Sequence, residues 1–232
     1  MKLTLTQPCS WTLLLLLLSN LLLWEDVALV PLCEEANGQC QLSLGYFFDQ
    51  ARELSENINV LSSETFKEFD QDFGIGQQVI FKFPMDCHIS SVSIPSNATQ
   101  AHEMQPTDLL NVTMHMVAAW EVPVKRAVDE MADVEAMPGF SAIITKLRAL
   151  HDKITKLMQY LQDVKTLLSQ VHLEAEQNEN YLAWSGLPYL EMDNKRSRLF
   201  VYHTLLRCLN SDAEKIATFV KTLRCQMVPS KC

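Results

Sequence analysis

Glycine is scarce in this sequence, with 6 in 232 residues, and no low-complexity tract or repeat takes its place. A fold made of many short strands needs frequent glycine-bearing turns, so the composition favours helices. The sequence also lacks the H-E-x-x-H, G-x-S-x-G and Gly-rich phosphate-binding motifs. Gly74-Ile75-Gly76 continues as Gln-Gln-Val, so the dinucleotide pattern fails as well. We therefore expect neither an enzyme nor a cofactor.

Positive charge is also in short supply, because 19 Lys and Arg stand against 28 Asp and Glu. This acidic balance argues against nucleic acid as a partner and against broad heparin binding. A glycan- or matrix-associated factor would need a clustered basic patch. The nearest examples are Lys125-Arg126 and Lys195-Arg196-Ser197-Arg198, and both are short.

Long apolar runs are absent except at the start, from Trp11 to Trp24. About 14 residues fall short of the roughly 20 that span a bilayer. Lys2 precedes the run, acidic residues end it, and Ala28 offers a small residue for cleavage. These features predict a secretory signal peptide over residues 1–28, with the cut placed to within a residue or two. Residues 29–232 then form one secreted, extracellular domain that does not insert into membranes, large enough for a single core.

The spacing of apolar residues predicts four long helices, over about residues 43–73, 106–134, 141–173 and 197–226. Ser43 is the expected N-cap of the first helix, and Gly74 and Gly76 are expected to end it. Pro123 is expected to kink or break the second helix near its end.

The segments between these helices read as an irregular arm, two long connections and one short break. Residues 29–42 form the arm, with a turn at Asn37-Gly38. The first connection, 77–105, holds a short extended piece near 78–83. Because the first and third connections are long and the middle one is short, we expect an all-α, up-up-down-down bundle. An up-down-up-down bundle would not require the two long connections.

Six cysteines follow the leader, which holds a seventh, Cys9. They allow fifteen pairings, and none forms the close C-x2-C pair typical of a metal site. Histidines do not suggest zinc either. Three lie too far apart in the first crossover region and the second helix (His88, His102, His115), and three read as helix-surface or interface residues (His151, His172, His203).

Two sequons for N-linked glycosylation are present, at Asn97-Ala98-Thr99 and Asn111-Val112-Thr113. Asn97 falls in the polar first connection. Asn111 falls in the first turns of the second helix, opposite the face of Leu110, and is accessible if that face looks outward.

Several motifs together resemble the prolactin branch of the growth hormone family, over essentially the whole secreted chain. They are Cys33-x6-Cys40, the stretch from Cys87 to Ala119-Trp120, Tyr181-Leu-Ala-Trp-Ser-Gly-Leu-Pro188, Cys208-x16-Cys225 with Asp212 inside, and Cys225-x6-Cys232. Ile89 stands where the family has a small polar residue. The resemblance implies a long-chain four-helix cytokine bundle. It also implies three disulfides, Cys33–Cys40, Cys87–Cys208 and Cys225–Cys232.

The same resemblance implies a monomeric hormone that binds a class I cytokine receptor. One face combines the first and last helices with the crossover near Val92–Gln105, and a second, weaker face recruits another receptor chain. Candidate residues of the first face are Ser55, Glu56, Asn59, Ser211, Glu214, Lys215 and Thr218. The other reading is that these are ordinary solvated positions.

Departures from the family pattern concentrate on these faces. Glu56, Asn59 and Glu214 occupy positions where prolactins carry histidine. Ala217 replaces a carboxylate, Ser211 replaces an arginine, and Lys215 is kept. Asp163 stands where the second face has a small glycine. The resemblance therefore implies a placental or uterine prolactin-like hormone that does not bind the prolactin receptor strongly. A lactogen with altered contacts is the alternative within the family.

Overall fold

The computed structural model describes residues 33–36, 39–73, 87, 93–132, 139–172, 183–191, 194–228 and 232. The predicted leader, the extended piece near 78–83 and the turn at Asn37-Gly38 lie outside these residues. The chain divides into two units, Met1–Ser43 and Leu44–Cys232. Among the described helices, none is both long and apolar enough to cross a membrane.

The first unit contains a two-stranded antiparallel ladder where an irregular arm was predicted. Strand β1 (Cys33–Ala36) pairs with β2 (Gln39–Leu42), with Cys33 opposite Leu42 and Glu35 opposite Cys40. Each strand has only four residues, about the shortest run in which an alternating pattern is visible. The Cys33–Cys40 disulfide concerns side chains outside the description and stays a prediction.

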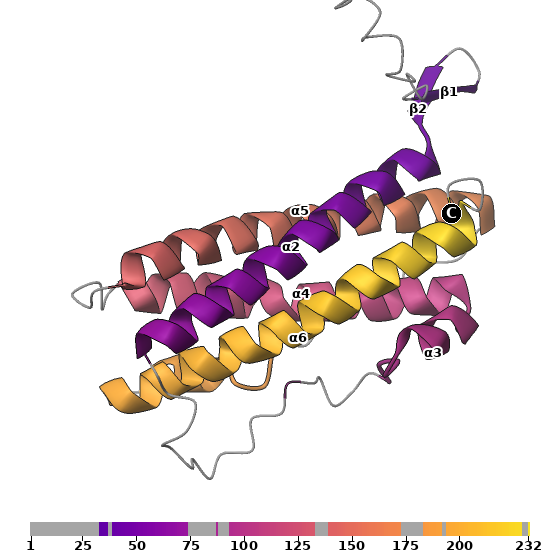
Figure 1. Ribbon diagram of the computed structural model, residues 1–232. Helices are drawn as coiled ribbons and strands as arrows, with labels where there is room; N and C mark the ends of the chain where they lie inside the picture. Colours follow the sequence, from indigo (N-terminus) through magenta and orange to yellow (C-terminus); the bar gives the residue numbers. More distant parts are fainter. Residues whose placement is uncertain are drawn as a thin grey trace, which may run out of the picture. The chain divides into compact units, whose positions relative to one another are not determined.

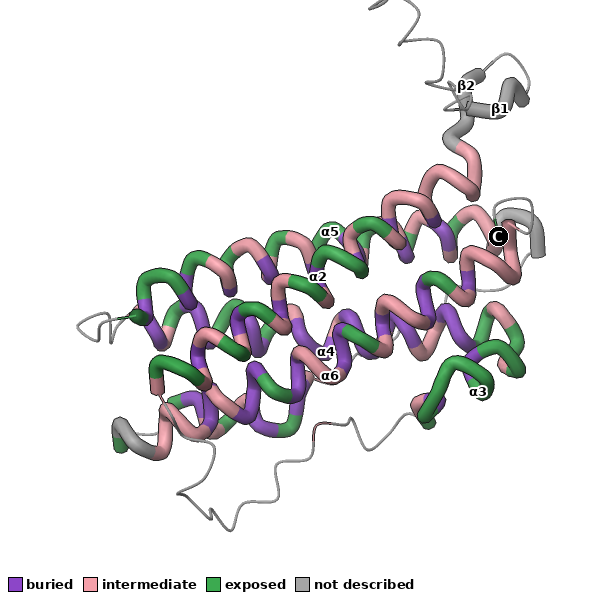
Figure 2. Tube along the Cα trace, in the orientation of Figure 1, coloured by how far each residue is buried: buried purple, intermediate pink, exposed green. Residues whose placement is uncertain are grey.

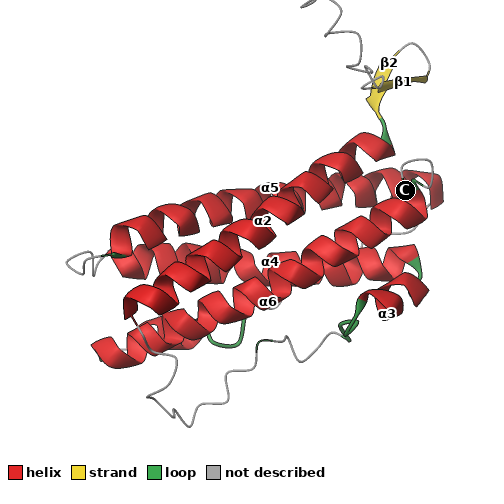
Figure 3. Ribbon diagram, in the orientation of Figure 1, coloured by secondary structure: helices red, strands yellow, loops and turns green. Residues whose placement is uncertain are grey.

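The second unit is helical (Figures 1 and 3). Its elements are α2 (Leu44–Phe73), α3 (Ala98–Glu103), α4 (Pro106–Ala132), α5 (Phe140–His172), the 3-10 helix η2 (Leu187–Glu191) and α6 (Lys195–Met227). The four predicted long helices are confirmed to within two residues at every end. Helix α3 was missed, because its six residues fall inside a polar stretch that reads as a connection.

The four long helices form a bundle in which α2 and α4 each pack against both α5 and α6. Helices α2 and α5 run in opposite directions. Phe47, early in α2, contacts Tyr160, late in α5, and Glu68, late in α2, binds Lys146, early in α5. Buried positions recur along all four helices (Figure 2), as expected where each helix covers the apolar stripes of its neighbours.

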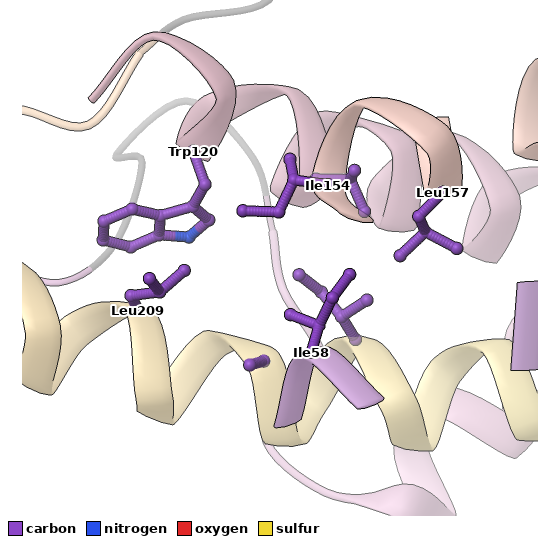
Figure 4. Close-up of a pocket in the computed structure, with 8 residues that line it drawn as sticks. Ile58, Trp120, Ile154, Leu157 and Leu209 are labelled. Carbon is purple, nitrogen blue, oxygen red and sulfur yellow. The ribbon is translucent and has the colours of Figure 1, made fainter. Parts of the chain in front are cut away.

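All four helices converge on one small apolar cavity (Figure 4). Its lining comes from α2, α4, α5 and α6 (Ile58, Val117, Trp120, Ile154, Leu157, Leu209, Ala213 and Ile216). The cavity measures about 10 Å³, about the space of one water, and no polar side chain but the Trp120 indole lines it. The centre of the bundle is therefore dry and close-packed.

The short break between α4 and α5 depends on a glycine. Gly139 has φ 92° and directly precedes α5, and a side chain rarely adopts this left-handed conformation. A Cβ placed on Gly139 would also lie 2.8 Å from Asp72 Oδ2 at the end of α2. The glycine is thus required mainly by the turn, because the exposed Asp72 carboxylate can move away from an added Cβ.

Pro123 does not end α4, which continues to Ala132. A proline cannot donate to the carbonyl four residues earlier, so Ala119 O loses its helical partner. The Trp184 backbone N–H, in the connection before α6, donates to Ala119 O over 3.2 Å. This bond satisfies the carbonyl that Pro123 releases, which lowers the cost of keeping proline inside the helix.

Trp184 also stacks on Trp120, with ring centroids 5.8 Å apart. Trp120 Nε1 in turn donates to Asp212 Oδ2 on α6 over 3.1 Å. Asp212 is only 4% exposed, and burial raises its pKa from 3.8 to about 6, against the opposing effects of Lys215 and of the Trp120 hydrogen bond. Two tryptophans and one carboxyl group thereby join α4, α6 and the last crossover.

Replacing Ile58 by Ala should lower the free energy of unfolding by about 3–4 kcal/mol, because it enlarges a cavity that already lies at the centre of the core. Val60→Ala is the matched control on the same helix, since Val60 is 58% exposed and should cost less than about 0.5 kcal/mol. Urea unfolding of both variants measures the difference. Similar losses in the two variants would contradict the position of the core.

Asp212→Asn should flatten the dependence of stability on pH between about 4 and 6. Because the folded carboxyl has its pKa raised from 3.8 to about 6, its contribution is fully present below the unfolded pKa and is lost as pH rises through 6. The variant should therefore gain about 1–3 kcal/mol over the parent at pH 7.5. That gain should shrink toward zero near pH 4. Urea unfolding of both proteins at several pH values measures this gain. A stability difference that does not change with pH would refute the raised pKa of Asp212.

Candidate functional site

Helices α2 and α6 lie side by side in opposite directions and are joined at two places. Arg224 Nε donates to Asp49 Oδ1 over 2.7 Å at one end, and His203 Nε2 lies 3.2 Å from Asp70 Oδ1 at the other. Asp49 and Asp70 are 21 residues apart, as are His203 and Arg224. The two helices therefore stay in register between these pairs, and we call this stretch the α2–α6 seam.

Counting inward from either pair places Glu56 opposite Ala217 and Asn59 opposite Glu214. The structure thus brings together these four predicted positions from segments about 160 residues apart. Glu56 and Glu214 are exposed, while Asn59 and Ala217 are half-buried. Within this middle stretch an ion pair forms inside α2 itself, from Arg52 Nη1 to Glu56 Oε1 over 2.9 Å. The middle of the seam is therefore accessible, polar and weakly acidic.

Ser55 does not belong to this surface, so its selection as a receptor contact was wrong. It is fully buried, and its hydroxyl donates to the Arg52 carbonyl over 2.8 Å. A small serine whose hydroxyl bonds back to the helix fits a core position. Sequence periodicity alone could not distinguish it from Glu56, its exposed neighbour.

The remaining candidates on α6 lie along another stripe. Ser211, Lys215 and Thr218 follow one another at helical spacing, and all three are half-buried. Thr218 donates to the Glu214 carbonyl over 3.0 Å. The positive charge of Lys215 lowers the pKa of buried Asp212, against the larger effect of burial. These three residues are therefore less accessible to a binding partner than Glu56 and Glu214.

The first crossover is fastened beside this stripe at two points. A disulfide joins Cys87 to Cys208. Farther along α6, Gln226 Nε2 donates to the His102 carbonyl over 2.9 Å and to the Met104 carbonyl over 3.4 Å. The described part of the crossover, including α3, therefore runs along α6 toward its C-terminal end. The second described disulfide, Cys225–Cys232, closes a small ring at that end.

Gln226 was not predicted as a functional residue, and neither was α3. One signal was present in the sequence, since Asn97 followed by Ala-Thr-Gln is a good helix start. The structure confirms that start, with Asn97 Oδ1 accepting from the Gln100 N–H over 2.9 Å. The partner of Gln226 could not be predicted, because it is a backbone carbonyl more than a hundred residues away.

His203 marks the end of the seam and packs on Phe66, with ring centroids 5.3 Å apart. Burial lowers its pKa below 6.5, more than Asp70 raises it, and Arg207 lowers it further. The imidazole is thus neutral at physiological pH and serves packing. Among the described residues, no group of His, Cys, Asp and Glu is arranged to hold a metal.

Asp163 lies on α5, on the side that faces the start of α2. It is half-buried. The pKa of the Tyr160 phenol is raised mainly by burial and by Tyr46, and Asp163 and Glu53 raise it further. Tyr160 also contacts Phe47 on α2, with ring centroids 6.2 Å apart. The position predicted for the second face therefore carries a carboxylate beside an aromatic cluster.

A double-mutant cycle on Asp49 and Arg224 should give a coupling free energy of about 1–2 kcal/mol, because both side chains are partly buried at the end of the seam. The matched cycle on Arg52 and Glu56, an exposed pair within one helix, should give less than about 0.5 kcal/mol. Urea unfolding of the alanine variants supplies both values. Equal couplings would show that Arg224 does not fix the register.

Comparison with known proteins gives the family of this chain. The model of the somatotropin hormone family matches residues 16–232. Prolactin-5A1 of Rattus norvegicus is 46% identical over 222 residues, which cover 96% of this chain and 97% of the relative. Prolactin-2A1 is 37% identical in Rattus norvegicus and 35% in Mus musculus, with 98% of this chain and 97% of each relative covered. The resemblance to the prolactin branch is thereby confirmed, and the chain belongs to the somatotropin hormone family.

Proposed function

We propose that this chain is a secreted, glycosylated prolactin-like hormone that acts by binding the ectodomain of a class I cytokine-type receptor. A placental or uterine role in pregnancy is part of the proposal, and it rests on the family resemblance alone. The predicted signal peptide over residues 1–28 supports secretion. The remaining residues, 29–232, then form the single hormone domain.

Up-up-down-down connectivity is the topology we infer for this domain. Two facts support it. The segments between α2 and α4 and between α5 and α6 are long, whereas only seven residues separate α4 from α5. Moreover, α5 and α6 each run opposite to α2, as the contacts of Lys146 and Arg224 indicate.

The middle of the α2–α6 seam carries the proposal about receptor choice. Prolactins have imidazoles at the positions of Glu56, Asn59 and Glu214, and an imidazole can donate as well as accept hydrogen bonds. An ionised carboxylate only accepts. A receptor surface built for imidazoles would therefore lose partners here and would face two added negative charges, Glu56 and Glu214. We infer that the prolactin receptor is not a strong partner.

Asp163 extends the same proposal to the second face. A carboxylate at a packed contact has to be desolvated, and without a cationic partner this cost opposes binding. The second receptor chain would therefore need a cation near Tyr160 and Asp163, or would not be recruited through this face.

The test is binding of the secreted, disulfide-bonded protein to immobilised prolactin-receptor ectodomain. We expect binding at least about a hundred-fold weaker than that of prolactin, since several central contacts are replaced together. The triple variant Glu56→His, Asn59→His, Glu214→His should recover at least about ten-fold in affinity.

A matched triple variant keeps the number of added histidines but moves them to α4 and α5, outside the seam. Asp129, Ala142 and Asp152 are exposed there, and Asp129→His, Ala142→His, Asp152→His should not raise the affinity. Nanomolar binding by the parent would instead identify a lactogen. Retention on heparin at physiological salt, without binding to target cells, would favour a matrix-associated factor.

A further inference from the structure

The two sequons differ in what the fold does to them. Asn97, Ala98 and Thr99 are all exposed. Asn97 itself lies outside the regular helix, with extended backbone angles of φ −153° and ψ 170°. Its side chain accepts a hydrogen bond through Oδ1, and this bond does not use Nδ2, the atom to which a glycan is attached.

Helix α4 buries the threonine of the Asn111 sequon. Thr113 is 0% exposed, and its hydroxyl donates to the Leu109 carbonyl over 2.7 Å. The carbonyl of Asn111 accepts its helical bonds in the same turns and also lies 2.8 Å from His115 Nδ1. An enzyme that recognises N-x-T has to reach the threonine as well as the asparagine. In the folded protein the threonine of this sequon is out of reach.

We propose that both asparagines are sites of N-linked oligosaccharides, and that Asn111 accepts its glycan only before α4 forms whereas Asn97 accepts it before or after folding. In each transfer, Nδ2 displaces a lipid diphosphate from C1 of the donor sugar. The new C1–N bond replaces the C1–O bond, and one amide proton leaves with the diphosphate. The donor is a lipid-linked oligosaccharide.

The folded protein can nevertheless carry a glycan on Asn111. This side chain is half-exposed, and it begins a stripe at helical spacing through His115 and Ala118 to Val122, which is 51% exposed. Helix α4 has no extensive contact with α2, so the α2–α6 seam remains clear of this position. The fold therefore restricts the time at which Asn111 can be modified. It still leaves room for the attached glycan in the folded protein.

Asn97 occupies a different place, on the first crossover. The crossover is fixed to α6 at Cys208 and at Gln226, positions separated by about 27 Å along the helix. Asn97 lies between the attached crossover residues, Cys87 and His102. Asn97 therefore lies on a crossover that is fastened to α6, the helix that carries Ser211, Lys215 and Thr218. The order of modification rests on the burial of Thr113 and on the predicted secretory leader, not on the proposed receptor binding.

The experiment uses the chain without its leader, made without glycans, in two forms. One is folded and disulfide-bonded, and the other is reduced, alkylated and unfolded. Each is incubated with a purified single-subunit oligosaccharyltransferase and a lipid-linked oligosaccharide, and occupancy is followed by peptide mass spectrometry. The unfolded chain should be modified at both asparagines. On the folded chain the initial rate at Asn111 should be at least about a hundred-fold below that at Asn97, because a packed helix opens rarely.

Asn97→Gln and Asn111→Gln variants assign each glycan. Folded Asn97→Gln should accept almost none, whereas folded Asn111→Gln should match the parent. Comparable modification of Asn111 in the folded and unfolded chains would overturn the proposal, as would an unfolded chain that accepts nothing at Asn111. Neither result depends on any receptor, so failure of the proposed function would leave this test unchanged.

Discussion

The disulfide between Cys87 and Cys208 is the constraint on which the arrangement of this hormone depends most. It joins residues 121 positions apart, and in the chain-entropy view a loop of that length contributes roughly 4–5 kcal/mol to stability. Because Cys208 lies in the middle of α6, the bridge holds the first crossover against that helix. Gln226 then fastens the end of the crossover, and the start of α4 follows within a few residues.

The bundle separates the residues that fix its geometry from those that are exposed in the middle of the seam. Asp49 with Arg224 and Asp70 with His203 keep α2 and α6 in register, and they lie at the ends of the seam. The exposed positions Glu56 and Glu214 lie between them and contribute little to packing. Substitution at these two exposed positions should therefore be nearly neutral for stability, so this surface can vary on an unchanged scaffold.

The sequence pattern was sufficient to locate the long helices. It was insufficient to predict which single residues are buried and which distant groups they contact. An apolar stripe of thirty residues outweighs errors at single positions, so α2 and α5 could be located closely. Ser55 shows the opposite case, because a serine gives no signal of burial when its hydroxyl bonds within its own helix. Helix α3 was too short to show a period. The family motifs carried the disulfides that periodicity could not supply, and of these the structure describes Cys87–Cys208 and Cys225–Cys232.

Pro123 shows how far local rules depend on distant parts of the chain. Because proline has no backbone N–H, the Ala119 carbonyl lacks its partner within the helix. The backbone N–H of Trp184, more than sixty residues later in the chain, donates to that carbonyl instead. The hydrogen bonding of α4 is thus completed by the connection that precedes α6. During synthesis, α4 therefore reaches its full hydrogen bonding only after the segment at Trp184 has been made and has docked.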